Sequence, residues 1–318
     1  MQHKYLRLIF GVISVFVIIG LIISFYCSAA PSSNSYNNTY LFLGLDDAAQ
    51  NADSIMLVRF EANRGMIIMQ IPRDTYCKYG KGQNKLNGLF PFLRSRVETA
   101  SKALEEFTRH ISKSFGISID GAFALTRSSF CKIIDQIGGV KIRLENQQIF
   151  VDDNSNVILS LAPGEHVLDS EAAELFVRHR KGYSFGDLSR MDVQKTFIAG
   201  FVNTCNSISP ITMLNVYEDI KNDLISTVSI SKELKNAIKY LSRVKELDIV
   251  CFTAPGEPIY SKEGISYYSL NFFAMRKTLE KLFSSTDFDS DKQFLKQGDI
   301  AFENIYFDDN FNFKIPTS

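Results

Sequence analysis

A long uncharged run near the N-terminus constrains the topology of the chain before any other feature. Leu8–Tyr26 contains no charged residue, and about 20 apolar residues suffice for a helix to cross the hydrocarbon core of a bilayer. The apolar region of a cleaved signal peptide is usually shorter, at roughly 7–15 residues. Lys4 and Arg7 precede the run and favour a cytoplasmic N-terminus. We therefore predict a cytoplasmic tail over 1–7, a single transmembrane anchor over 8–28, and an extracytoplasmic C-terminal domain at the cell membrane.

The composition argues against two classes of function. The chain has 35 basic and 35 acidic residues, and Lys4 and Arg7 are the only charges before Asp46, so the rest carries a net formal charge of about −2. Such a body has no general attraction for nucleic acid, and we expect no nucleic-acid partner. The five cysteines form no CxxC pair, and the four histidines show no zinc-ligand spacing.

Strand-like and helix-like segments alternate beyond a linker rich in Ser, Asn and Pro at 29–39. The strand-like segments are 40–45, 54–60, 66–71 and 140–144, and the helix-like segments are 95–115, 128–137, 170–178 and 188–204. This alternation predicts an α/β layered domain with a central mixed sheet over 40–204. Similar patterns continue without a shift in composition, so 205–318 is predicted to continue the same ectodomain.

Charged side chains gather at the ends of the first three strand-like segments. These residues are Asp46, Asp53, Arg73 and Asp74. The short connections permit an antiparallel meander, which would place all four at one edge of the sheet. Two carboxylates there could approach one magnesium ion, which prefers oxygen ligands. Aspartates at strand ends are also common turn formers, so spacing alone leaves both interpretations open.

A second polar cluster follows the helix-like segment at 170–178. It consists of Arg178, Arg180, Asp187, Arg190 and Gln194. Arg190 and Gln194 are four residues apart and would share one face of a helix. Arg178 and Arg180 are two apart, so in extended chain they point the same way. Guanidinium groups match phosphate oxygens in pairs, although a solvated basic face would have the same composition.

Seven segments recur in the order and spacing of a known family. They are LFLGLD (41–46), DSIMLV (53–58), QIPRD (70–74), KLNGLF (85–90), IGGVKI (137–142), LAPGEHVLDSEAAELFVRHRK (161–181) and GDLSRMDVQ (186–194). Over roughly residues 40–204 the chain resembles the LytR–CpsA–Psr family. The resemblance implies an α-β-α ectodomain that holds a polyprenyl (pyro)phosphate and a magnesium ion. It also implies transfer of teichoic acid, capsule or similar polymers onto peptidoglycan.

The resemblance assigns roles to residues by position. It implies that Asp46 and Asp53 are the carboxylate ligands of Mg2+. The implied pyrophosphate-binding set is Arg73, Arg178, Arg180 and Arg190, with Gln194 beside it and Lys85 as a further phosphate candidate. Asp74 and Asp187 match acids of the family motifs, and with Arg73 they form the expected catalytic set. Asn51 and Ala52 stand where the family usually has Arg-Ser before the second aspartate.

The function implied by the resemblance is that of a phosphotransferase in the cell membrane. Its donor would be a polyprenyl-pyrophosphate glycan and its acceptor peptidoglycan. Four arginines and a divalent cation against two aspartates would leave an electropositive site, suited to charge that develops on a leaving phosphate. The same residues could instead hydrolyse or simply bind a lipid pyrophosphate, and a non-enzymatic membrane regulator is a third alternative.

Overall fold

The computed structural model describes most of the chain beyond residue 36. The described residues are 37–48, 51–61, 65–80, 82–152, 154–178, 196–201, 203–205, 207–228, 249–261, 264–282, 306–307 and 313–314. The predicted anchor over 8–28 lies outside them. Within these ranges, the helices are all too short or too polar to cross a bilayer.

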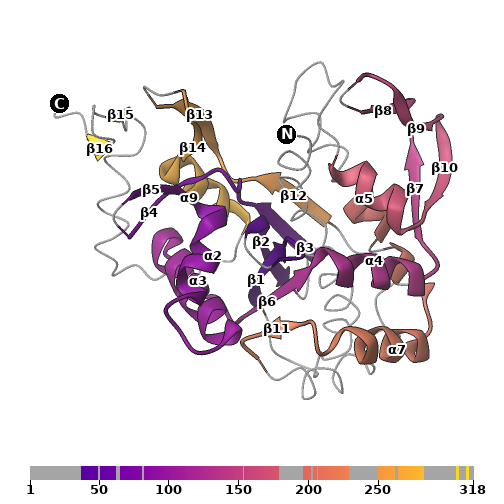
Figure 1. The fold of residues 1–318 in the computed structure, drawn as a ribbon, viewed down its shortest axis with the longest axis horizontal. Helices are drawn as coiled ribbons and strands as arrows, with labels where there is room; N and C mark the ends of the chain where they lie inside the picture. Colours follow the sequence, from indigo (N-terminus) through magenta and orange to yellow (C-terminus); the bar gives the residue numbers. More distant parts are fainter. Residues whose placement is uncertain are drawn as a thin grey trace.

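A six-stranded mixed sheet forms the centre of the molecule (Figure 1). Its strands, in spatial order, are β11 (Ile225–Ser226), β6 (Gly121–Thr126), β1 (Asn37–Leu45), β2 (Ala52–Glu61), β3 (Gly65–Gln70) and β12 (Ile249–Thr253). β2 pairs antiparallel with both β1 and β3, whereas β6 pairs parallel with β1 and β12 parallel with β3. The predicted mixed sheet and its N-terminal meander are therefore confirmed.

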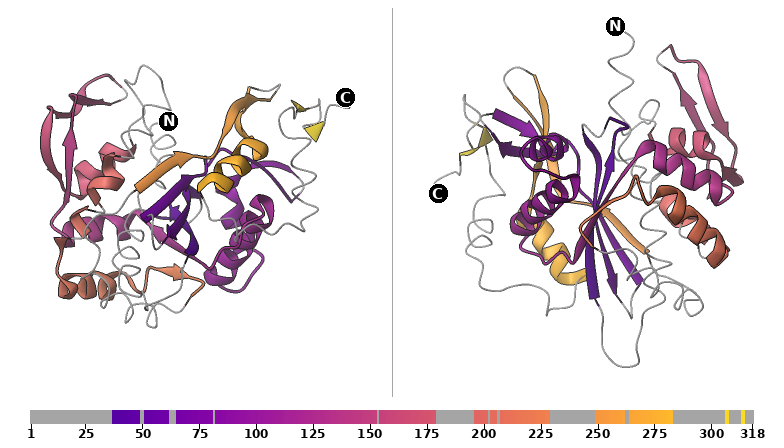
Figure 2. Two further views of the ribbon diagram at one scale, coloured as in Figure 1. Left: turned by 180° about the vertical axis from the view of Figure 1, so that it is seen from behind. Right: turned by 60° about the horizontal axis from the view of Figure 1, so that its bottom comes forward.

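Helices cover both faces of this sheet (Figure 2). Successive side chains of a strand point to opposite faces, so along β1 Leu41 and Leu43 enter one core and Phe42 the other. The first core is closed by α2 (Leu89–Arg94), α3 (Ala100–Phe115) and α9 (Phe272–Leu282). The second is closed by α4 (Arg127–Gln136), α5 (Ser170–Arg178) and α7 (Pro210–Ile220). Burial on both faces explains why β1 is continuously apolar over residues 40–45.

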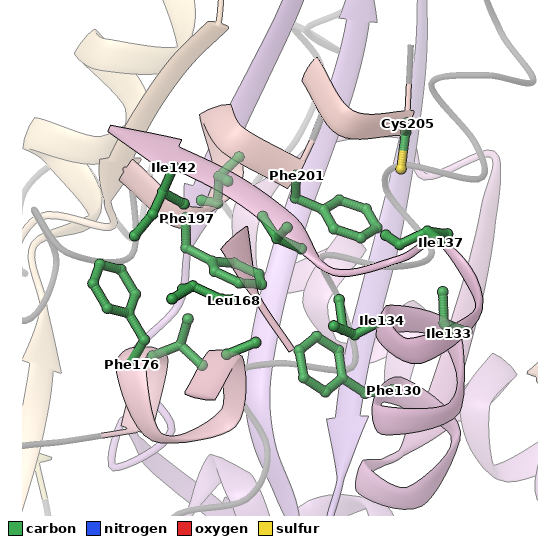
Figure 3. Packing of buried hydrophobic residues seen from close by; sticks show 14 of the residues in the cluster. Phe130, Ile133, Ile134, Ile137, Ile142, Leu168, Phe176, Phe197, Phe201 and Cys205 are labelled. Carbon is green, nitrogen blue, oxygen red and sulfur yellow. The ribbon is translucent and has the colours of Figure 1, made fainter. Parts of the chain in front are cut away.

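The second core contains several buried phenylalanines packed among isoleucines (Figure 3). Phe130 of α4, Phe176 of α5, Phe197 and Phe201 are almost completely buried. The rings of Phe197 and Phe201 stack with centroids 6.2 Å apart, and Phe130 lies at the same distance from Phe197. Each fully buried ring contributes roughly 1.5–3 kcal/mol to folding. These contacts fix α4 and α5 against the sheet, which matters because both helices lead toward the site.

The start of α3 differs from the periodicity of its sequence. The apolar spacing predicted a helix from residue 95, but α3 begins at Ala100. The reason is the cap, because the Thr99 side chain accepts the backbone N–H of Lys102 and stops the helix there. At the other end Gly116 adopts a left-handed conformation with φ 65°, which favours glycine and ends the helix.

Short two-stranded ribbons and one 3-10 turn surround the central layers. The ribbons are β4 (Tyr76–Tyr79) with β5 (Gly82–Lys85), β7 (Val140–Leu144) with β10 (Gly164–Leu168), β8 (Gln148–Val151) with β9 (Val157–Leu161), β13 (Gly256–Tyr260) with β14 (Ser266–Leu270), and β15 (Tyr306–Phe307) with β16 (Phe313–Lys314). The 3-10 turn, η1 (Leu86–Gly88), follows β5. Beyond residue 205, β12 extends the central sheet and α9 enters its first core.

Candidate functional site

One edge of the sheet brings together three charged residues named from the sequence. Strands β1 and β3 end there and β2 begins there, as the meander predicts. The Asp46 N–H donates to the Asn51 carbonyl at 3.1 Å, which closes the connection between β1 and β2. Asp46, Asp53 and Arg73 are all buried, at 9%, 4% and 8% exposure. We call these three residues the sheet-edge cluster.

An ion pair connects two members of the cluster. Arg73 Nη1 donates to Asp53 Oδ1 at 2.9 Å. Asp46 Oδ2 accepts from the Asn51 side-chain amide at 3.0 Å, so the residue that departs from the usual family Arg-Ser supports a carboxylate. Breaking a buried ion pair by removing one partner usually costs about 3–5 kcal/mol, because the other charge stays buried. The cluster is therefore a fixed part of the fold.

The cluster has the donor chemistry of a magnesium site. Two carboxylates and one guanidinium carry a formal charge of −1, which a divalent cation would offset. Mg2+ is usually held by one or two carboxylates together with waters and substrate phosphates. Among the described residues there is no group of three or more His, Cys, Asp or Glu side chains suited to a metal. Asp46 and Asp53 would supply two carboxylates to a cation at this edge, and any further ligands would come from elsewhere.

Arg73 is held by its backbone as well as its side chain. The Thr75 N–H donates to the Pro72 carbonyl at 3.0 Å, which forms a turn around Arg73. The Arg73 carbonyl accepts the Asn87 N–H at 3.1 Å, so η1 braces the same turn. The segment QIPRD is thus a rigid exit from β3 that directs Arg73 back to the sheet edge.

Asp74 and Lys85 form a second, more exposed ion pair. Lys85 Nζ lies 3.0 Å from Asp74 Oδ1, and both side chains are about one-third exposed. The Lys85 ammonium also lies 5.8 Å from the centre of the Tyr267 ring. The Asp74 carbonyl accepts the Tyr268 N–H at 2.9 Å, which ties β14 to this turn. The structure thus pairs these two predicted site residues with each other.

The second predicted cluster is only partly described. Arg178 is the last residue of α5, and the backbone there is helical. Arg180, Asp187, Arg190 and Gln194 lie outside the described residues. Their roles in phosphate binding and catalysis therefore stay predictions.

Sequence reasoning missed Arg127 and its two acidic partners. Arg127 forms ion pairs with Asp47, next to Asp46, and with Glu174 of α5. A signal existed, because Glu174 lies between Ala173 and Phe176 on the face of α5 that enters the core. A glutamate at such a position requires a cationic partner, but sequence cannot identify a partner 47 residues away.

A thiol and an imidazole meet in a small cavity on the first-core side. Cys77 Sγ lies 3.4 Å from His110 Nε2, and both line a cavity of about 70 Å3. Burial raises the pKa of the Cys77 thiol to about 12 and lowers the pKa of His110. The pair is therefore neutral near pH 7, unlike the thiolate–imidazolium pair of a cysteine nucleophile.

Comparison with known proteins agrees with this description. The fold and the sheet-edge cluster define a mixed α/β domain with an acidic and basic site at the ends of a meander. The profile of the LytR_cpsA_psr family matches residues 27–284, and the chain belongs to that family.

Two relatives and one solved structure illustrate the similarity. The polyisoprenyl-teichoic acid–peptidoglycan teichoic acid transferase TagU of Oceanobacillus iheyensis is 29% identical over 234 residues, which are 72% of this chain and 69% of TagU. The corresponding transferase TagT of Bacillus subtilis is 25% identical over 269 residues, 79% of this chain and 77% of TagT. The structure of TagT bound to LIIa-WTA has a TM-score of 0.59 at 19% identity and covers 80% of this chain and 94% of that chain. That structure has the same fold.

Proposed function

We propose that the protein transfers a polyprenyl-pyrophosphate-linked glycopolymer, such as teichoic acid or capsule, to peptidoglycan by Mg2+-assisted phosphotransfer. Family membership and the two transferases named above support this function. The observation that carries it is the buried sheet-edge cluster, in which two carboxylates and a guanidinium held by an ion pair lie at one edge of the sheet. That combination suits a pyrophosphate and a divalent cation together.

In the proposed mechanism the chain's own residues bind and orient the donor. Arg73, Arg178, Arg180 and Arg190 would donate hydrogen bonds to pyrophosphate oxygens, with Gln194 and Lys85 beside them. Asp46 and Asp53 would hold Mg2+, which supplies charge neutralisation for the pyrophosphate when bound. Because the Arg73 guanidinium is held by Asp53 before reaction, it would stabilise negative charge as it develops on the leaving group.

The transfer step breaks one phosphoanhydride bond and forms one phosphoester bond. A peptidoglycan hydroxyl attacks the phosphorus linked to the glycan, and the bond from that phosphorus to the bridging oxygen breaks. Polyprenyl phosphate leaves, and the glycan is joined to peptidoglycan through a phosphodiester. The hydroxyl proton passes to a base within hydrogen-bond reach. Asp74 and Asp187 are the proposed candidates for that role.

The proposal also places the domain at the outer face of the cell membrane. The uncharged run Leu8–Tyr26 would be its anchor, and ten residues separate Tyr26 from the start of β1 at Asn37. At most about 3.3–3.6 Å of extended chain per residue gives a reach of roughly 35 Å. The site would therefore stay close to the membrane that holds a polyprenyl donor.

The test is where a labelled polymer ends up. Purified protein would be incubated with a radiolabelled lipid-linked polymer, peptidoglycan and MgCl2, with EDTA and an Asp53→Asn variant as controls. We expect label on peptidoglycan only with wild-type protein and Mg2+. Label released as free polymer would instead show a hydrolase, and unchanged donor in every reaction would contradict an enzymatic role.

A further inference from the structure

One arginine outside the sheet-edge cluster joins three segments of the chain. Arg127, the first residue of α4, donates through Nη1 to Asp47 Oδ2 at 3.1 Å. Its Nε and Nη2 lie 2.9 and 2.8 Å from Glu174 Oε2. Asp47 Oδ1 also accepts the backbone N–H of Ser128 at 2.9 Å. Arg127, Asp47 and Glu174 thus form one connected network, which we call the Arg127 bridge.

The bridge is fixed in the core at one end. Glu174 is 7% exposed and belongs to the face of α5 that packs against α4. The Cys131 thiol, one turn after Arg127, lies 3.7 Å from the same Glu174 oxygen. Glu174 is buried and the Arg127 side chain is 34% exposed, so loss of Arg127 would leave the Glu174 carboxylate in the core without this cation. At the other end the Asp47 side chain is 46% exposed, so the bridge extends from the core to the surface connection after β1.

The ends of the bridge adjoin the two halves of the proposed site. Asp47 directly follows Asp46, and Leu45 pairs with Thr126, so the chain after β1 and the start of α4 leave the sheet side by side. Figure 1 shows α4 continuing from β6 and α5 lying beside α4. Glu174 precedes Arg178 by four residues, about one turn of the same helix. Arg127 therefore lies between a carboxylate segment and an arginine segment.

We propose that Arg127 is a positioning residue for the proposed transferase site. It fixes the connection that carries Asp46 relative to the C-terminal end of α5, so that Asp46 and Arg178 reach one pyrophosphate–Mg2+ complex. The inference rests on the proposed function, since it takes Asp46 as a metal ligand and Arg178 as a phosphate ligand. Groups that orient metal ligands without touching the metal typically change metal affinity about 10–100-fold.

Position and charge predict different outcomes for Arg127→Lys, which makes the inference testable. If the bridge acted only through its charges, removing the negative Asp47 would weaken cation binding. Replacing Arg127 by lysine would then change little, because the positive charge stays. If the bridge acts by position, Asp47→Asn and Arg127→Lys both weaken cation binding, because a lysine ammonium cannot span two carboxylates as a guanidinium does.

The experiment is a calorimetric titration of the full chain in detergent. MgCl2 would be titrated into wild type, D47N, R127K and the D47N/R127K double variant, each saturated with farnesyl pyrophosphate as the probe. Farnesyl pyrophosphate would also be titrated in EDTA. The matched control is E165Q, which removes an ion pair with Arg143 whose side chains are 81% and 80% exposed. D46N reports separately on the proposed metal site.

We expect D47N and R127K each to bind Mg2+ about tenfold more weakly than wild type, with the double variant no weaker than the worse single variant. E165Q should match wild type, and D47N should keep its melting temperature because Asp47 is exposed. Wild-type affinity in R127K, or additive losses in the double variant, would overturn the bridge while leaving the proposed function intact. Wild-type affinity in D46N would instead overturn the proposed metal site.

Discussion

Arg73 and Asp74 are neighbours in sequence, but their ion pairs differ in kind. The Arg73–Asp53 pair is buried, with side chains 8% and 3% exposed, whereas the Asp74–Lys85 pair is 35% and 30% exposed. Removing either partner of a buried pair destabilises the fold, because the remaining charge stays in a low-dielectric environment. A partly exposed pair contributes about 0–1 kcal/mol, because water replaces the lost partner. The first pair should therefore couple function to stability, and the second should not.

Among the substitutions that test this contrast, Arg73→Ala is expected to have the largest effect on activity and stability. It should abolish transfer and lower the free energy of unfolding by roughly 3–5 kcal/mol, because Asp53 would remain buried without this cation. Urea denaturation measures the change. The double variant R73A/D53A should recover part of the stability, although not activity. A single variant as stable as wild type would show that the pair does not hold the sheet edge.

Asp46→Asn should separate function from stability. Asp46 accepts a hydrogen bond from the Asn51 amide, and an asparagine of the same size retains an acceptor oxygen. We expect Mg2+-dependent transfer to fall by more than about 100-fold, beyond the usual loss for groups that only support a metal ligand. Activity as a function of MgCl2 concentration, with a melting curve as control, measures both. Full activity of the Asp46→Asn variant in the presence of a chelator would exclude a metal role for Asp46.

Breaking the partly exposed Asp74–Lys85 pair should change stability little, in contrast to breaking the buried Arg73–Asp53 pair. Asp74→Asn should change the free energy of unfolding by no more than about 1 kcal/mol, because Lys85 is one-third exposed. Transfer should nevertheless fall sharply if Asp74 takes the acceptor proton. Lys85→Met breaks the same ion pair and keeps the carboxylate, so it is the matched control for the stability measurement. Wild-type activity in D74N would remove Asp74 from the catalytic set.

The smallest effects concern pH and the Cys77–His110 contact. Burial lowers the pKa of His110 in the folded protein, so the unfolded chain binds more protons below pH 6.5. Stability is then fully present above about pH 6.5 and is lost as pH falls toward the folded pKa. His110→Gln should reduce the decrease in the free energy of unfolding between pH 7 and pH 5, as measured by denaturation. An unchanged slope would contradict the burial argument.

The Cys77 thiol should affect stability at alkaline pH, at the other end of the same pH series. Burial raises the pKa of Cys77 from 9.0 to about 12, so the folded state holds the proton more tightly. Its contribution is fully present below about pH 9 and is lost as pH rises toward 12. Cys77→Ala should therefore reduce the loss of stability between pH 9 and 10.5. The two variants together show whether the cavity holds a neutral pair.

Short-range patterns in the sequence predicted the features that depend on the main chain, namely the first three strands and the residues at their ends. Connections of a few residues between the first three strands permitted a meander, and a meander would place Asp46, Asp53 and Arg73 at one edge of the sheet. The direct Arg73–Asp53 bond could not be predicted, because it depends on a register shift after Gly44 and on the turn around Arg73. The positions of Arg73 and Asp53 along the strands predicted that the two residues lie close together. Their side-chain geometry determines that they form an ion pair.

Long-range polar contacts were beyond the reach of the same reasoning. Arg127 contacts Asp47 and Glu174, which lie 80 and 47 residues away in the chain. Neither periodicity nor motif spacing links them, since the parallel pairing of β6 with β1 and the packing of α5 on α4 bring them together. Residues that position a site are harder to predict than residues that occupy motifs.

The most direct test of the central claim is a crystal structure of the ectodomain with MnCl2 and a polyprenyl pyrophosphate. Mn2+ replaces Mg2+ at carboxylate and phosphate sites and can be located by its anomalous scattering. We predict one metal peak between the Asp46 and Asp53 carboxylates, with pyrophosphate oxygens on the metal and on the Arg73 guanidinium. A pyrophosphate bound elsewhere, or a metal peak away from both aspartates, would contradict the sheet-edge cluster as the centre of the reaction.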